Sequence, residues 1–191
     1  MKRTSLQSHP CSIARTLDAA GEWWTPLILR DVAYGVRRFR EIQEDLGISA
    51  NVLADRLEAA VEEGLLVTSV YQERPRRHEY VLTEKGADLI PALLALMQWG
   101  DRWKFPGGRG PVRVTHEQCG HEVRVEVRCP HCEREAALAE LRARPRAGVS
   151  AAPSPEEPGH VSARRLLSDA GGVRLAAPAP APSAAPAAPG S

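Results

Sequence analysis

Three of the four cysteines and three of the six histidines lie in one short stretch, residues 116–132, HEQCGHEVRVEVRCPHC. Thiolate sulfur and imidazole nitrogen suit zinc, and two ligands separated by two residues can bind one ion from one tight turn. The stretch contains two such pairs. The ligand set that the spacing predicts is His116, Cys119, Cys129 and Cys132. We therefore expect one structural zinc ion.

The identity of the histidine ligand is open between two residues. His116 has the two-residue spacing to Cys119, and Gly120 allows the chain to turn tightly after the pair. His121 lies only two positions beyond Cys119, which is an awkward bite for one tetrahedral ion. We favour His116 and keep His121 as the alternative.

Two other chemistries compete with a structural metal ion. A redox pair at Cys129 and Cys132 of the thioredoxin type needs a βαβ unit around it, which the flanking sequence does not predict. A catalytic zinc ion needs an open coordination position and a general base, and no domain large enough for a pocket surrounds the cluster. We therefore expect no enzyme. Alternating valines predict strands, so we expect residues 105–142 to form a zinc-ribbon-like β-hairpin, ending in a short helical run.

The remainder of the chain gives this cluster its context. The 191 residues carry a net charge of +1, so a claim of DNA binding must depend on local placement of charge. The sequence shows no secretory signal and no apolar run near the roughly 20 residues of a membrane-spanning helix. We expect a cytoplasmic protein without a membrane partner. From residue 143 to 191 Ala, Pro, Ser and Gly dominate, which predicts a disordered tail.

Residues 1–104 predict a mainly α domain with a small β wing (α+β), a winged helix-turn-helix. Short helices end at Gly21, Gly35 and Gly47, and a fourth, residues 49–63, begins at the N-cap Ser49. Its predicted core face is Val52, Leu53, Leu57 and Val61. The short turn between the third and fourth helices is typical of a helix-turn-helix. Two β-rich runs joined by ERPRR follow and predict the wing, residues 71–80.

A long apolar helix, residues 84–103, is expected to close this domain. Its apolar residues cover more than one stripe, which favours packing against a second copy of the chain. Pro91 lies inside the predicted helix and should bend it, since proline removes one backbone hydrogen bond.

The second helix of such a motif enters the major groove with its first residues near the base edges. Asn51 could pair with adenine there. Arginines before the motif and at the wing tip could contact phosphates, because closely spaced arginines repel one another unless an anion is near. The candidate DNA contacts are Arg37, Arg38, Arg40, Ser49, Ala50, Asn51, Arg56, Arg74, Arg76 and Arg77. Alternatively, Arg56 forms a surface ion pair and Asn51 only completes the first helical turn.

The sequence resembles the HxlR family of bacterial winged-helix regulators, within the MarR-like group, over residues 11–103. The resemblance lies in GEW before an apolar helix, RF ahead of the motif, GIS, RL, GLL, EYVLTEKG and WGDRW, in family order. Ala60, where a larger aliphatic residue is expected, and Trp23 beside Trp24 depart from the pattern. The resemblance implies a homodimeric repressor or activator that binds double-stranded DNA, with dimer contacts from the first and last helices. Of the two, we expect a repressor.

The resemblance also draws attention to Cys11, because some similar proteins use a cysteine just ahead of the first helix to sense oxidants or electrophiles. A thiol at a helix N-terminus is biased toward the reactive thiolate. The alternative is a small buried residue at the dimer seam. An oxidant or a small molecule is therefore a candidate effector. Two further functions stay open: a protein-interaction adaptor that uses the ribbon and tail, and a thiol- or zinc-responsive form of the regulator.

Overall fold

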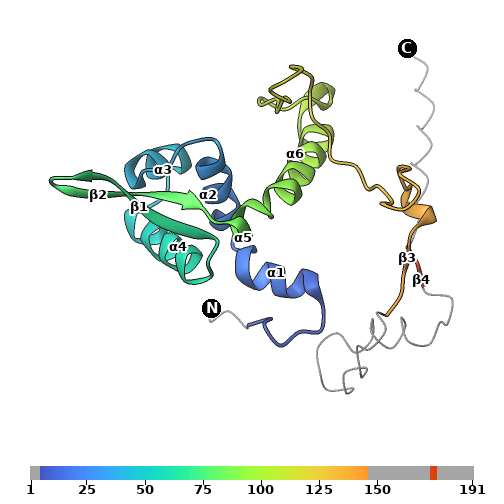
Figure 1. Ribbon diagram of the computed structural model, residues 1–191, viewed down its shortest axis with the longest axis horizontal. Coiled ribbons are helices and arrows are strands. Elements are labelled where there is room, and N and C mark those ends of the chain that lie inside the picture. The colour runs from blue at the N-terminus through green and yellow to red at the C-terminus, as the bar shows by residue number, and fades with distance from the viewer. Residues whose placement is uncertain (1–4, 146–172, 176–191) are drawn as a thin grey trace, which may run out of the picture. The chain divides into compact units, whose positions relative to one another are not determined.

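The computed structural model of the chain describes residues 5–145 and 173–175 (Figure 1). It divides into two units, Met1–Val125 and Glu126–Ser191, and each is described by itself. Most of the predicted disordered tail lies outside the described residues. Within the described part of the chain, no helix has the length and apolar character needed to cross a membrane.

The four helices predicted for the start of the first unit are all present. They are α1 (Ser12–Ala20), α2 (Trp24–Ala33), α3 (Phe39–Leu46) and α4 (Ala50–Glu62). Helix α2 begins at Trp24, and Thr25 is buried in its first turn. Helix α3 ends at Gly47, whose φ of 62° is a left-handed conformation that favours glycine.

A two-stranded antiparallel hairpin follows, formed by β1 (Leu66–Glu73) and β2 (Arg76–Leu82). Figure 1 shows it extending away from α2, α3 and α4, as a wing does. Its base is fastened to the helices, because the Thr83 hydroxyl donates to the Gly64 carbonyl at 2.6 Å and the Thr83 amide donates to the Leu65 carbonyl at 3.1 Å. The winged helix-turn-helix prediction is confirmed at this level.

One apolar core holds the helices and the base of the hairpin together. It is built from α2, α3, α4 and the start of β1, and its buried members are Ile28, Leu29, Val32, Ile42, Ile48, Leu53, Leu57, Ala60, Leu65 and Leu66. Ala60, the departure from the family pattern, is fully enclosed in this core. Val52, predicted to face the core, is instead exposed, since Leu53 and Leu57 already define the buried face of α4.

The prediction of a single long helix over residues 84–103 is wrong. The structure has a short helix α5 (Glu84–Ala87) and then α6 (Ile90–Lys104). Pro91 lies in the first turn of α6, not inside a continuous helix. The physical reason is that the first turn of a helix leaves its N–H groups unpaired, so proline costs least there.

The continuous hairpin predicted for residues 105–142 is not formed in the described residues. After a 3₁₀ turn, Pro106–Gly108, there are only two isolated antiparallel bridges, Thr115 with Glu122 and Arg128 with Glu135. Each bridge closes a small turn of its own, so no long ladder develops between them. The predicted helical run is reduced to a 3₁₀ turn, Leu138–Glu140. The second unit also pairs β3 (Arg142–Ala143) with β4 (Val173–Arg174).

The core position of α4 gives a direct test of this packing. Leu53 is fully buried and its neighbour Val52 is 37 % exposed. We expect Leu53→Ala to lower the free energy of unfolding by about 2–5 kcal/mol, because it leaves a cavity. Val52→Ala is the matched control and should change it by less than about 0.5 kcal/mol. Urea unfolding followed by circular dichroism measures both, and equal effects of the two variants would contradict the burial pattern.

Candidate nucleic-acid interface

The start of α4 is presented to solvent by a short, well-defined turn. Gly47 lets the chain leave α3, and Ile48 anchors the turn because its side chain is buried. The Ser49 hydroxyl oxygen accepts a hydrogen bond from the Val52 amide at 3.4 Å, which caps α4. Ser49, Ala50 and Asn51 are all exposed. The residues predicted to approach base edges are therefore free to do so.

The arginines before α3 and those of the wing line one surface cleft. Arg38, Arg40, Arg76 and Arg77 border a cavity of about 590 Å³, together with Phe39, Glu41, Tyr71, His78 and Tyr80. The two segments are connected directly, since the Tyr80 amide donates to the Arg37 carbonyl at 2.9 Å. In the sequence these arginines form two separate groups, one before the motif and one at the wing tip. The structure brings four of them to a single face.

The arginine side chains of this cleft are partly held in place. The Arg38 guanidinium lies 4.4 Å from the centre of the Tyr71 ring, and one of its nitrogens lies 3.5 Å from a Glu41 carboxylate oxygen. Burial raises the pKa of Tyr80 above its ordinary value, so its hydroxyl stays protonated and can donate a hydrogen bond. Tyr71 and Tyr80 were not predicted as site residues; their place in the β-rich runs was the only available signal.

Arg56 and Arg74 lie outside this cleft. A guanidinium nitrogen of Arg56 is 3.8 Å from a Glu22 carboxylate oxygen, which supports the alternative of a surface ion pair. Arg74 is exposed at the tip of the wing, and its carbonyl accepts a hydrogen bond from the Gln72 side chain at 2.9 Å. Of the ten predicted residues, four therefore line the cleft. The six that do not are Arg37, Arg56, Arg74 and, at the start of α4, Ser49, Ala50 and Asn51.

Arg30 of α2 links the buried carboxylate of Asp31 to Asp45 of α3. Arg30 donates from Nε to Asp31 Oδ1 at 2.8 Å and from Nη2 to Asp45 Oδ2 at 2.9 Å. Asp31 is only 2 % exposed, and its Oδ2 has no hydrogen-bond partner among the described residues. Burial raises the pKa of Asp31 above its ordinary value, and the Arg30 guanidinium acts in the opposite direction. No pattern in the sequence indicates this contact between helices.

Cys11 lies where it was predicted, immediately before α1. It is the N-cap residue of that helix and is half-buried, and its side chain makes no capping hydrogen bond. The described residues around it include no second cysteine within α1 or α2. Its sensing role stays a prediction.

The predicted metal ligands occur as two pairs, one in each unit. In the first pair, His116 Nδ1 lies 3.3 Å from Cys119 Sγ. In the second, hydrogen bonds from the Cys132 and His131 amides, and from the Cys132 side chain, hold the pKa of the Cys129 thiol below its ordinary value. Among residues 5–145 and 173–175, no three His, Cys, Asp or Glu side chains already gather as the ligands of one ion.

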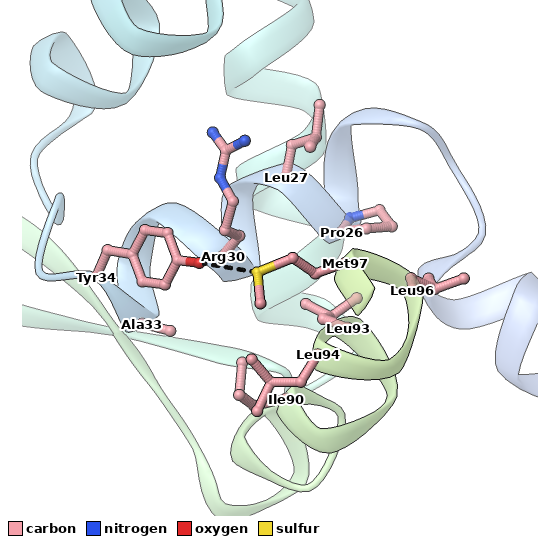
Figure 2. Close-up of a pocket in the computed structure, with 10 residues that line it drawn as sticks. All are labelled: Pro26, Leu27, Arg30, Ala33, Tyr34, Ile90, Leu93, Leu94, Leu96 and Met97. Atoms are coloured by element: carbon pink, nitrogen blue, oxygen red, sulfur yellow. Dashed lines mark hydrogen bonds between the residues drawn. The ribbon is translucent and has the colours of Figure 1, made fainter. Parts of the chain in front are cut away.

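An apolar groove of about 320 Å³ separates α2 from α6 (Figure 2). Its walls are Pro26, Leu27, Arg30, Ala33 and Tyr34 from α2 and the following turn, and Ile90, Leu93, Leu94, Leu96 and Met97 from α6. The Tyr34 hydroxyl contacts the Met97 sulfur at 3.9 Å across it, as the dashed line in Figure 2 marks. The apolar character of α6 could be predicted from the sequence, but this groove could not.

Comparison with known proteins identifies relatives of this chain. A family model described as HxlR-like helix-turn-helix matches residues 19–107. The uncharacterized HTH-type transcriptional regulator Rv3095 of Mycobacterium tuberculosis is 41 % identical over 141 residues, which cover 73 % of this chain and 89 % of the relative. The regulator YvaP of Bacillus subtilis is 35 % identical and covers 52 % of this chain and 94 % of its own length.

Two solved structures are similar as well. The crystal structure of PA1607, a candidate transcription factor, has a TM-score of 0.66 and 38 % identity, and it covers 73 % of this chain and 98 % of its own. The candidate transcription factor PA1374 of Pseudomonas aeruginosa has a TM-score of 0.53 and 38 % identity, over 73 % of this chain and 95 % of its own.

The similarity to Rv3095 extends beyond the winged helix. Its 141 aligned residues exceed the family region, residues 19–107, by more than the 18 preceding residues can supply. The alignment therefore continues into the segment that contains the Cys and His pairs.

The cap of α4 gives a test of how the start of this helix is held. We expect Ser49→Ala to lower the free energy of unfolding by about 1 kcal/mol, because it leaves a helix N–H without its acceptor. Ser49→Asp keeps an acceptor at the N-cap and should change the free energy by less than about 0.5 kcal/mol. Thermal unfolding of the three proteins measures this. An unchanged free energy of unfolding in Ser49→Ala would show that the cap contributes nothing to stability.

Proposed function

Because the chain belongs to the HxlR-like helix-turn-helix family, we propose that it is a homodimeric transcriptional repressor that binds double-stranded DNA through α4 and the β1–β2 wing. The observation that carries this proposal is the basic cleft between α3 and the wing, beside the exposed start of α4. A transcriptional regulator of the helix-turn-helix type is also what the related proteins are named, and none of those names describes an enzyme.

The cleft offers a chemistry that suits the DNA backbone. Arginine binds phosphate oxygens through a planar fork of N–H groups, and two arginines from each of two segments would follow one stretch of the backbone. Arg38 is stiffened by its contacts with Tyr71 and Glu41, which reduces the side-chain entropy lost on binding. The protonated Tyr80 hydroxyl adds a neutral donor to the same surface.

We assign base recognition to the start of α4. Phosphate contacts fix the orientation of a protein on DNA, and side chains in the groove read the sequence. Asn51 is exposed in the first turn and carries the donor and acceptor pair that adenine requires. Arg56 is the weaker candidate, because Glu22 already provides a partner. Repression follows most simply, since a dimer bound at an operator excludes polymerase without needing any other surface.

Dimer formation is supported by large apolar residues that are exposed on α1 and α6. Neither α1 nor α6 contains a buried residue. Ile13 on α1 is 71 % exposed, and Leu96, Trp99 and Trp103 on α6 are 63 %, 55 % and 61 % exposed. Large apolar residues exposed on two helices are typical of an interaction site. We propose a second copy of the chain as its partner, with the groove between α2 and α6 forming part of the interface.

The wing provides the decisive test of DNA binding. The probe is a duplex selected from random sequence by the full-length wild-type chain. Replacement of Arg74, Arg76 and Arg77 by alanine should lower affinity by about 10-fold or more and reduce the slope of log K against log salt by about 0.9 for each lost phosphate contact. In a reporter strain, expression of the reporter gene should be higher with this variant than with the wild-type protein.

The matched control removes the same charge elsewhere. Arg109, Arg113 and Arg124 are exposed arginines outside the cleft, and their replacement by alanine should leave the slope unchanged. Equal losses in the two triple variants would mean that only total charge matters. An unaltered affinity of the wing variant would favour the adaptor function, in which the winged helix is a scaffold.

Sedimentation equilibrium tests the dimer. We expect the wild-type protein to have the mass of two chains and the Leu96→Asp variant the mass of one. The reason is that the new carboxylate would be buried without a partner at the interface. Val67→Asp is the control, because Val67 is also an exposed apolar residue but lies on the wing. A Leu96→Asp protein that stays dimeric would place the interface elsewhere.

A further inference from the structure

A second cavity adjoins the groove between α2 and α6. Its volume is about 460 Å³, and it shares the lining residues Arg30, Tyr34 and Met97 with the groove (Figure 2). Unlike the groove, it is bordered by three carboxylates, one from each of three helices: Asp31 of α2, Asp45 of α3 and Asp101 of α6. We call it the acidic cavity. Its size is that of a small-molecule site.

The Asp31 carboxylate is the most deeply buried charged group of the acidic cavity. It is 2 % exposed; its Oδ1 accepts a hydrogen bond from Arg30 Nε at 2.8 Å, and its Oδ2 has no hydrogen-bond partner among the described residues. Burial raises the pKa of Asp31 although Arg30 lies beside it, so the guanidinium does not fully replace the lost hydration. A buried carboxylate oxygen without a donor is unfavourable. A donor supplied by a ligand would remove that penalty.

Negative charge exceeds positive charge around the acidic cavity. Arg30 is the one cationic residue that lines it, and this guanidinium is already shared between Asp31 and Asp45, the latter at 2.9 Å. Asp101 has no ion-pair partner within the part of the chain that the structure describes. Three carboxylates and one guanidinium therefore leave an excess of negative charge, which favours a positively charged ligand.

The loop that follows α6 forms another wall of the acidic cavity. Phe105, Pro111 and Val112 from this loop line it with apolar surface. The loop passes directly against Asp101, because a β-carbon added at Gly110 would collide with the Asp101 carboxylate. Glycine at this position thus allows the close approach of the loop to α6.

The segment beyond this loop is fastened to α6 as well. The Gln98 side chain donates to the Val123 carbonyl at 3.1 Å and accepts from the Val125 amide at 3.0 Å. The chain from α6 to Val125 is therefore held on the helix at both of its ends, by the helix itself and by Gln98. The apolar wall between these ends is a fixed part of the cavity.

The other walls suit an organic cation better than a metal ion. Tyr34 and Phe105 line the cavity with rings that are 50 % and 44 % exposed in their residues, so a ligand can reach them. An aromatic ring attracts a cation placed over its face. Nowhere in the described ranges do three His, Cys, Asp or Glu side chains gather as the ligands of one metal ion. A larger cation with an apolar body can contact carboxylates that are farther apart.

We propose that the acidic cavity binds a small organic cation, an amine or amidine that carries an aromatic or apolar body. Its N–H groups would donate to Asp31 Oδ2, and Asp101 would be the second carboxylate that balances its charge. The body would lie among the apolar and aromatic walls. This proposal does not depend on DNA binding, and its test contains no DNA.

Gly100 offers a way to block the acidic cavity without changing any charge. It lies inside α6, where glycine is otherwise unfavourable, and it lines the cavity. A β-carbon added at Gly100 would meet no atom within 4 Å. A leucine at this position can therefore fill open space without a collision at its β-carbon.

Three matched probes test the proposal on the full-length chain. Benzamidinium, benzamide and benzoate share one aromatic ring and carry a positive, a zero and a negative charge. Each is titrated into the protein, and ligand-observed NMR gives its Kd. We expect saturable binding of benzamidinium at one site per chain. Benzamide and benzoate should bind at least about 10-fold more weakly, because only the amidinium brings a charged donor to the buried carboxylate.

Variants of the chain locate the bound probe. Asp31→Asn removes the charge with little change of shape and should weaken benzamidinium binding by about 10-fold or more. Asp101→Asn should weaken it by only about 2- to 5-fold, because Asp101 is less buried. Gly100→Leu should abolish binding. Asp88→Asn is the matched control, because Asp88 is an exposed carboxylate outside the cavity, and it should leave the Kd unchanged.

Several outcomes would overturn the proposal. Benzamide or benzoate that binds as tightly as benzamidinium would mean that the apolar walls or Arg30 select the ligand. Absence of saturable benzamidinium binding, or the same Kd in the wild-type protein, Asp31→Asn and Gly100→Leu, would overturn it too. Circular dichroism shows whether each variant keeps its helices. If Asp31→Asn does not fold, Gly100→Leu decides the question, because it leaves Asp31 in place.

Discussion

The rest of the structure depends on one constraint, the burial of one face of α4 against α2 and the base of the wing. Leu53 and Leu57 are enclosed by Ile28, Leu29 and Leu66, so α4 can neither rotate nor slide without exposing apolar surface. This packing leaves the first turn of α4 at the surface, where Asn51 is exposed to solvent. The same core anchors β1, and the position of the wing follows from it. Packing on the inside thus sets which side chains are available on the outside.

The local elements could be predicted from the sequence because their signals are local. Apolar spacing, the Ser49 cap and the glycine stops fixed the helices to within a residue or two. Pro91 was assigned to the interior of a helix because the apolar pattern continued through it; only the structure shows that the chain ends α5 and restarts there. The ribbon was over-predicted for a similar reason, since alternating valines indicate strands but do not say whether those strands find a partner.

The candidate site was predicted residue by residue but not as a surface. Arg38 and Arg76 are far apart in the sequence, and their meeting depends on the bond from Tyr80 to the Arg37 carbonyl, which no pattern reveals. The contact of Arg30 with Asp31 and Asp45 is equally invisible, because it joins two helices through charges that look like ordinary surface residues.

Gln98 shows how a helix can stand in for the missing edge of a sheet. Its amide group presents one acceptor and one donor to the backbone on either side of Arg124, as a neighbouring strand would. A carboxylate of the same length could only accept, and an aliphatic side chain could do neither. The two hydrogen bonds that join α6 to this part of the extension therefore depend on the chemical asymmetry of a single side chain. We expect a glutamine at this position of α6 in relatives that carry such an extension, and other residues in relatives that end with the helix.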